Sequence, residues 1–316
     1  MADGISVSAG IVQRLDAPQK PVGSLRKLSR RRSTSALLLC LPLLLLVVCL
    51  EIYPTIYAIY LSMLDRKMIN FVGLDNFIFM LSRDSFQLVV FQSALFAISA
   101  VIMKAFLGFI LAHLMHNIRG KNQRIWRGLL LIPWVIPLAL STLTWFWLFD
   151  PSYSAFNWTL KALGIDPIPF LGTTWNARIA VIVVNVWFGA PFFMIMYLAA
   201  LKSVPEQLYE AAAIDGAGAW QKLAFITIPM MRNIIMITVL YSLIGTFADF
   251  DIVRILTNGG PQDSTHLFAT YAFTVGIQSG NIPRGASVSL FMFPILAILA
   301  VVVLRDVMKR NREIAS

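Results

Sequence analysis

The chain has 316 residues, of which 58% are hydrophobic and 13% charged, and its formal net charge is +10 at pH 7. A soluble domain has about 45–50% apolar and about 25% charged residues, so this composition excludes an ordinary soluble protein and indicates an integral membrane protein. The basic residues lie mainly at the ends of apolar runs rather than in a soluble domain, so nucleic-acid binding is not favoured.

Residues 1–35 are polar, carry seven Lys and Arg residues, and are expected to form a basic cytoplasmic tail. The apolar run that follows is longer than the hydrophobic region of a signal peptide and has no small-residue cleavage site, so it is expected to be a retained span. Within the tail, "SLRKLSRRRSTS" either contacts anionic lipid headgroups or is simply solvated, and both readings stay open.

Six apolar stretches are long enough to cross a membrane as helices, which takes about 20 residues. They are expected at about 36–62, 87–115, 128–149, 178–201, 233–256 and 286–305. Runs this continuous do not fit the alternating strands of a membrane barrel. The predicted fold is therefore all-α, with residues 36–316 forming one transmembrane domain of six helices.

The Lys and Arg residues between the expected spans are distributed unevenly. The tail, the second and fourth connections and the C-terminus together hold eighteen, whereas the alternate connections hold six. Because Lys and Arg accumulate on the cytoplasmic side, both termini are expected in the cytoplasm.

Lys104 is unusual because it falls in the middle of the second expected span. A lysine at the centre of a spanning helix costs about 2.5–3.5 kcal/mol on insertion scales. Two readings stay open: pairing with a carboxylate such as Glu51, and snorkelling of the side chain along its own helix to water.

The segment 203–229 is the most polar stretch between two late spans. Ser203 and Glu206 have the spacing of a capping box, with Pro205 in the first turn of the helix that they would begin. Gly216 stands where a left-handed residue ends a helix, and a second short helix is expected from about Trp220. On this local reading the segment is either an ordinary ordered loop or a surface that another protein approaches closely.

The sequence "EAAAIDGAGAWQKLAFITIP" in this segment resembles the signature of membrane subunits of binding-protein-dependent ABC importers. In that family the motif forms coupling helices that dock into a groove on the ATPase subunit. The only departure is Ile228 in place of leucine. The residues to which the resemblance assigns ATPase coupling are Glu210, Ala211, Ala212, Asp215, Gly216, Ile226 and Pro229.

Further stretches are similar to the carbohydrate branch of this family, and in particular to the first of its two permease subunits. They are "FVGLDNF" (71–77), "RGLLLIPWVIP" (127–137), "NVWFGAPF" (185–192) and "LTNGGP" (256–261). The likeness implies the type I ABC importer permease fold in its compact six-span form, as in glycerol-phosphate and trehalose-type systems. It also implies the partners: a second homologous permease subunit, two ATP-binding subunits, an extracytoplasmic solute-binding protein, a sugar substrate and membrane lipid.

A sugar site needs aromatic rings together with a few fixed polar groups. By resemblance to the maltose subunit, the substrate-contacting positions are Trp134, Asn185, Trp187, Phe188, Gly189, Phe192 and Asp249. Leu138 stands where that subunit has a polar residue, so the hydrogen bonds to the sugar must differ. Two alternatives stay open: each aromatic residue packs rather than binds, and Asp249 is hydrated at the outer end of its span.

The chain has no G-x-x-x-x-G-K-[ST] phosphate loop, since "RGKN" (119–122) lacks both the first glycine and the final Ser or Thr. No catalytic pair and no metal-ligand set is recognised, so no cofactor is expected on this chain and ATP with Mg²⁺ is expected on the partner ATPases. The sequence thus indicates a non-catalytic permease of the bacterial cytoplasmic (inner) membrane. The alternative is a stand-alone secondary transporter or channel for a small polar solute.

Overall fold

The computed structural model describes residues 36–315 except 38, 119 and 153, so the basic tail expected at 1–35 lies outside the described residues. The chain divides into two compact units, Met1–Tyr57 and Ala58–Ser316. In the described part of the first unit, a helix begins at Leu39 and passes through a π turn, η2 (Val48–Ile52). Its side chains are mostly exposed, as expected of a helix whose apolar surface meets lipid or a partner helix.

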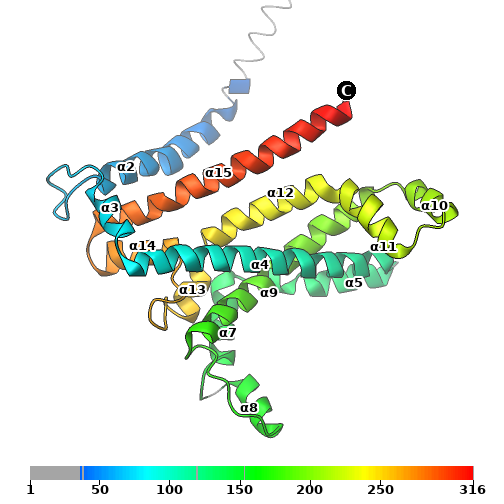
Figure 1. Ribbon diagram of the computed structural model, residues 1–316, viewed down its shortest axis with the longest axis horizontal. Coiled ribbons are helices and arrows are strands. Elements are labelled where there is room, and N and C mark those ends of the chain that lie inside the picture. Colours follow the sequence, from blue (N-terminus) through cyan, green and yellow to red (C-terminus); the bar gives the residue numbers. More distant parts are fainter. Residues whose placement is uncertain (1–35, 38, 119, 153, 316) are drawn as a thin grey trace, which may run out of the picture. The chain divides into compact units, whose positions relative to one another are not determined.

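Five helices are long and apolar enough to cross a membrane. They are Leu39–Ser62, which ends in α2 (Tyr53–Ser62), α4 (Asp84–Asn117), α9 (Thr174–Ser203), Ala219–Phe247, and Ile282–Asp306 within α15 (Ile282–Ala315). The described residues contain no β-strand, and the one isolated bridge among them joins Leu64 and Phe71. The all-α expectation is confirmed (Figure 1).

The stretch expected to form the third span is divided into shorter helices. Instead of one helix over 128–149, the structure has α5 (Lys121–Leu130), α6 (Ile132–Val135) and α7 (Leu138–Leu148). The second break falls at Ile136, whose backbone is extended ahead of Pro137. Proline has no N–H and disfavours a helical residue before it, so the break follows from the sequence.

The fifth span begins earlier than the expected 233–256. One continuous helix runs from Ala219 to Phe247 and comprises α11 (Ala219–Lys222), a π turn η3 (Leu223–Thr227) and α12 (Ile228–Phe247). Pro229 cannot donate to the carbonyl four residues earlier, and the π turn accommodates this gap in the ladder.

The remaining elements are short and connect the long helices. They are α3 (Asp75–Leu81), α8 (Ala155–Ala162), α10 (Glu206–Ile214), α13 (Asp251–Leu256), α14 (Phe268–Phe273) and a π turn η4 (Thr274–Gln278).

The helices α4 and α9 form the most extensive packing contact in the second unit (Figure 1). A stripe of small buried residues on α4 faces this contact, namely Ala100, Gly108 and Ala112. Without a hydrophobic drive between helices in lipid, small residues favour association because they let backbones approach closely. A Cβ built on Gly108 would lie 2.3 Å from the Cβ of Phe193 on α9, so only glycine fits there.

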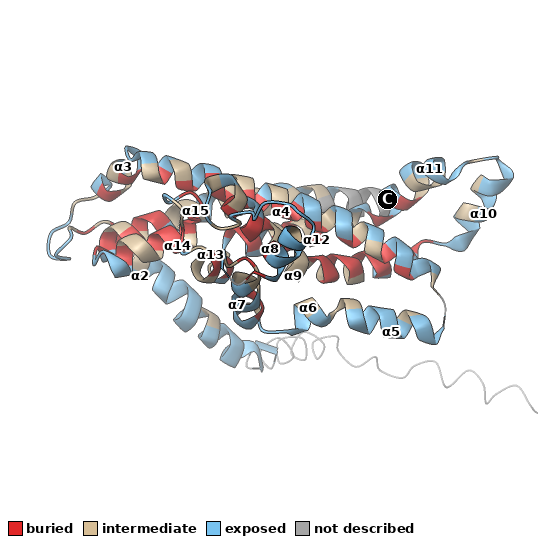
Figure 2. Cartoon of the chain, turned by 90° about the horizontal axis from the view of Figure 1, so that it is seen from below, coloured by how far each residue is buried: buried red, intermediate tan, exposed pale blue. Residues whose placement is uncertain are grey.

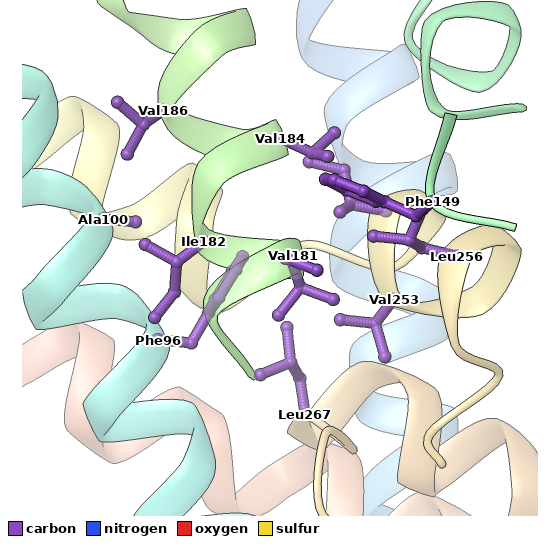
Figure 3. Close-up of a cluster of buried hydrophobic side chains, with 12 residues drawn as sticks. Phe96, Ala100, Phe149, Val181, Ile182, Val184, Val186, Val253, Leu256 and Leu267 are labelled. Atoms are coloured by element: carbon purple, nitrogen blue, oxygen red, sulfur yellow. The ribbon is translucent and has the colours of Figure 1, made fainter. Parts of the chain in front are cut away.

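Apolar side chains fill the space around this helix pair. Figure 2 shows that buried residues are concentrated on α4, α9, α12 and α14, whereas α5 and α10 are largely exposed. In the cluster of Figure 3, Phe96 of α4 and Val181 of α9 meet Leu267, while Val253 and Leu256 of α13 join from a third side. This cluster therefore packs the α4–α9 pair against α13 and the segment around Leu267.

Gly108→Ala is expected to destabilise the protein by about 1–3 kcal/mol, because the added methyl group overlaps the backbone side of Phe193. Thermal unfolding of the full-length chain in mild detergent should show a lowered melting temperature. The matched control is Gly128→Ala in α5, where an added Cβ meets nothing within 4 Å and alanine favours the helix. Equal melting temperatures for the two variants would contradict a tight α4–α9 contact.

Candidate functional site

The segment 203–229 forms a helix, a turn and the start of a second helix. α10 begins after Pro205, which accepts no side-chain cap bond, and the hydroxyl of Ser203 donates to the carbonyl of Ala200 at 2.7 Å. The capping box expected from Ser203 and Glu206 is therefore wrong. Ser203 is the last residue of α9, where its hydroxyl is taken up by the preceding turn.

The end of α10 agrees with the sequence. Gly216 has φ +76°, a left-handed conformation that side chains with a Cβ rarely adopt. The N–H of Ala217 donates to Ala212 at 2.8 Å and the N–H of Gly216 donates to Ala213 at 3.1 Å. These two bonds are those of a Schellman motif, so the turn is fixed by its backbone.

The motif residues on this segment divide into an exposed and an inward group. Glu210, Ala211, Asp215 and Gly216 are exposed, whereas Ala212 is partly buried. Ile226 packs against the buried cluster that contains Met194 and Met231, while Pro229 is exposed in the first turn of α12. The motif therefore combines exposed residues on one surface with residues that pack beneath it.

A group of large apolar side chains accompanies the exposed residues. Ile214 is 88% exposed, Trp220 80% and Phe225 78%. Behind this face, a cavity of about 1010 Å³ lies between the end of α4 and the segment, with Tyr209 and Trp220 in its lining. The hydroxyl of Tyr209 bonds that of Thr227 at 2.9 Å and so ties α10 to the start of the long helix.

A second polar region lies inside the helix pair. We call Lys104, Asn185, Thr246 and Asp249 the polar cluster. The ammonium of Lys104 donates to the hydroxyl of Thr246 at 2.8 Å, and that hydroxyl donates to the carbonyl of Ser242 at 2.6 Å. Lys104 is 4% exposed. The expectation that it snorkels along its own helix is therefore wrong, whereas pairing with Glu51 would join the two units and stays a hypothesis.

The carboxylate of Asp249, which follows α12, forms hydrogen bonds with α9 and α13. Its Oδ2 accepts from Asn185 at 3.0 Å, and its Oδ1 accepts from the N–H of Ile252 at 3.1 Å. Asp249 follows the span and is partly buried. Burial raises the pKa of the Asp249 carboxyl to about 6. The two hydrogen bonds and the Lys104 charge lower this pKa but do not outweigh the effect of burial.

The Oδ1 atom of Asn185 is buried and has no hydrogen-bond partner among the described residues. A buried acceptor without a donor costs about 1–3 kcal/mol, so it marks a position where a hydroxyl would bind favourably.

Gly189 makes room for the lysine. A Cβ at this position would lie 2.4 Å from Cδ of Lys104, so the lysine stem crosses α9 where α9 has no side chain. Sequence reasoning treated Gly189 and Lys104 separately and missed this relation. The signal that could have revealed it is the place of Lys104 within the small-residue stripe of α4, which makes it face another helix rather than lipid.

The aromatic residues expected to bind a sugar divide into two groups. Trp134 of α6 lies against Phe192 with ring centroids 5.8 Å apart, and Phe192 lies 5.3 Å from Tyr241. Asn185, Phe188, Gly189 and Phe192 follow one face of α9 at intervals of three and four residues.

Trp187 lies about 200° around α9 from Asn185. It packs on Trp145 of α7 with centroids 5.6 Å apart. The structure therefore gathers the other expected residues near one face and places Trp187 with α7.

These features define a helical membrane protein with a polar, aromatic-lined interior and an exposed helical platform at one end of its long helices. Residues 104–311 match the family described as binding-protein-dependent transport system inner membrane component. Because this match covers more than half of the chain, the chain belongs to that family. The resemblance inferred from its motifs is thus confirmed.

Relatives and solved structures agree with this family. The trehalose/maltose transport system permease protein MalF of Thermococcus litoralis is 33% identical over 283 residues, which cover 88% of this chain and 95% of that protein. A chain from a bacterial ABC transporter involved in the import of the acidic polysaccharide alginate has a TM-score of 0.78 at 21% identity, covering 91% of this chain and 99% of that one.

A second structure of the bacterial alginate transporter, in complex with an alginate pentasaccharide-bound periplasmic protein, has a TM-score of 0.75 at 22% identity, covering 88% and 94% of the two chains. At these identities the likeness shows the fold, which is that of a type I ABC importer permease.

Lys104→Met is expected to lower the melting temperature of the full-length chain in detergent, because it removes a cation that stabilises the Asp249 carboxylate. In an Asp249→Asn background the same change should have little effect, since no carboxylate is left uncompensated. The resulting coupling energy should be about 0.5–3 kcal/mol. Additive effects of the two changes would show that the two charges act independently.

Proposed function

We propose that this chain is the membrane subunit of an ATP-driven importer that carries a sugar or a related solute across the cytoplasmic membrane. The observation that carries the proposal is the exposed platform at 203–229, in a chain that belongs to a family of transport-system membrane components. A chain without a phosphate loop needs a separate ATPase, and this platform is suited to bind one.

The platform has the chemistry of a docking surface. Small residues along α10 allow close approach, while Ile214, Trp220 and Phe225 offer apolar anchors and Glu210 and Asp215 offer acceptors. The Schellman turn and the Tyr209–Thr227 bond fix its shape, so little ordering is needed on binding.

The long helix supplies a mechanical connection between the two regions. Ala219–Phe247 has 29 residues, so it is about 43 Å long, and it joins the platform to Thr246 of the polar cluster without a loop. A displacement of the platform therefore moves one wall of the polar cluster. In this mechanism, closure of ATP-loaded ATPases would pull on Glu210–Pro229 and open or close access to the polar cluster.

The polar cluster and the rings beside it are the proposed solute site. The unpaired Oδ1 of Asn185, once the buried cluster is opened to solute, and the carboxylate of Asp249 can bind hydroxyl groups, and the rings of Trp134 and Phe192 can cover the C–H face of a sugar. Phe188 and Gly189 complete this face of α9, and Lys104 positions Thr246 behind it. The sugar class is supported by the trehalose/maltose relative.

The proposed partners are a second homologous permease subunit, two ATP-binding subunits and an extracytoplasmic solute-binding protein. The binding-protein complex of the related alginate transporter supports the last of these. ATP and Mg²⁺ would be held by the ATP-binding subunits.

The proposed orientation places both termini and the platform in the cytoplasm. The platform follows the end of α9 and precedes the long helix Ala219–Phe247, and the same end of the bundle carries the basic start of α5. This is the side favoured by the Lys and Arg distribution.

A stand-alone secondary transporter is the second candidate, because Lys104 is a buried charge within a span and Asp249 is a partly buried carboxylate just beyond one, and such charges can couple ions to transport. The two candidates differ in whether the purified chain needs a hydrolysing partner. The next experiment separates them.

Gly216→Val is expected to abolish solute-stimulated ATP hydrolysis by the assembled complex in vesicles, because valine cannot adopt the left-handed turn that ends α10. The chain should still insert into the membrane. Gly216→Asn is the matched control, since asparagine tolerates this conformation and should retain most of the stimulation. Solute uptake by vesicles containing this chain alone, without an ATPase, would refute the importer proposal.

Asn185→Ala is expected to reduce uptake by about tenfold or more while the complex assembles normally, because the site loses a hydroxyl-binding amide. Trp187→Ala is expected to reduce uptake less than Asn185→Ala does, because the Trp187 ring packs on Trp145 of α7 and not on the Asn185 face of α9, and Trp158→Ala, at a 75% exposed tryptophan of α8, serves as its control. Uptake assays and copurification measure the two properties. Equal loss of uptake and assembly would assign the residue to packing.

A further inference from the structure

A cluster of three arginines lines a cavity that the transport mechanism does not use. Arg66, Arg83 and Arg284 surround a space of about 350 Å³ together with Phe79, Tyr271 and Ser279. All of these residues belong to the second unit. The cavity lies at the end of the long helices opposite to the platform, since Arg83 precedes α4 and Arg284 lies in the first turn of α15.

Each arginine stands at the end of a different membrane-spanning helix. Arg66 follows the helix that ends at Ser62, Arg83 directly precedes Asp84, and Arg284 is two residues after Ile282. The three guanidinium groups therefore converge at one end of the spanning helices. Basic side chains at the ends of spanning helices are placed to reach phospholipid headgroups.

The arginines are held in place by neutral contacts. Arg66 donates from Nη2 to the carbonyl of Ser279 at 3.3 Å. The guanidinium carbons of Arg83 and Arg284 lie 4.4 Å and 3.5 Å from the centroid of the Phe79 ring. Cation–π contacts of this kind fix a guanidinium group but leave its N–H donors free for another acceptor.

The backbone beneath the cavity is also closely packed. A Cβ on Gly285 would lie 2.4 Å from the Cα of Gly276, so the start of α15 and η4 touch through glycine. This contact fixes Arg284 beside the Ser279 end of η4.

Within the part of the chain that the structure describes, none of the three arginines forms an ion pair with a carboxylate. The nearby Asp65 accepts from the backbone of Ile69 and Asn70 instead. Three like charges facing one cavity repel one another, so an anion bound between them would relieve that repulsion.

We propose that this cavity binds the phosphate group of an anionic phospholipid. The proposal rests on the chain being a membrane component. The proposed orientation of the chain places the cavity at the extracytoplasmic leaflet. A guanidinium group presents a planar set of donors that matches two phosphate oxygens, and three such groups can surround one phosphate.

The surroundings favour a lipid over a soluble anion. Beside the cavity, Leu74, which directly precedes α3, is 59% exposed, and Ile78 and Leu81 of α3 are 63% and 53% exposed. Apolar side chains at this depth contact acyl chains, while the arginines contact the headgroup. A lipid therefore satisfies both the charged and the apolar parts of this surface.

The test titrates the purified full-length chain in mild detergent with phosphatidylglycerol and with phosphatidylcholine, and counts bound lipids by native mass spectrometry. The wild-type chain should bind phosphatidylglycerol in preference. The double variant Arg83→Gln/Arg284→Gln should weaken that binding by about tenfold or more. The control Lys67→Gln/Lys161→Gln removes two exposed charges from outside the cavity lining and should leave the binding unchanged.

The variant Arg83→Lys/Arg284→Lys keeps both charges but lacks the planar guanidinium donors, so its loss of phosphatidylglycerol binding should be intermediate. An intermediate loss would also show that misfolding is not the cause of the weaker binding. Two results would overturn the proposal. One is equal lipid retention by the double variant and the wild type. The other is binding of inorganic phosphate as strong as that of phosphatidylglycerol, which would indicate a site for a free anion.

A third contrary result is loss of capture of the solute-binding protein by the double variant in lipid-free detergent, which would assign the arginines to protein docking. These measurements need no ATPase. The lipid proposal can therefore be refuted while the importer proposal stands, and the importer proposal can be refuted while the lipid proposal stands.

Discussion

The close contact between α4 and α9 is the constraint on which the rest of the structure depends. Gly108 lets the two backbones meet, and Gly189 lets the stem of Lys104 cross from α4 past α9 to Thr246. Such a path and such a partner offset the cost of placing a lysine inside a membrane-spanning helix. The same two glycines therefore set both the packing and the position of the interior charges.

The long helix Ala219–Phe247 connects the platform to the polar cluster. Its first turns belong to the exposed platform, and its last turn carries the hydroxyl that accepts from Lys104. A single rigid helix can transmit a displacement that a loop would absorb. The polar cluster and the platform are thus two ends of one element, and the arginine cavity lies in a part of the structure that neither end uses.

Several elements could be predicted from local chemistry. The apolar runs predicted the long helices, and Gly216 predicted the left-handed turn because few other residues adopt that conformation. Other expectations failed where a neighbour decided the outcome. Ser203 was taken into the end of α9 rather than capping α10, and Pro137 divided an apolar run that composition alone made continuous.

The sequence by itself determined the membrane class, the helical fold and the family, because hydropathy and motif spacing are local properties of the chain. Tertiary structure alone decided which polar residues meet. Lys104, Asn185 and the Thr246–Asp249 pair come from three separate stretches, and the hydrogen bonds between these stretches depend on where helices cross. Side chains distant in sequence meet only through packing, and periodicity along one helix does not specify its neighbour.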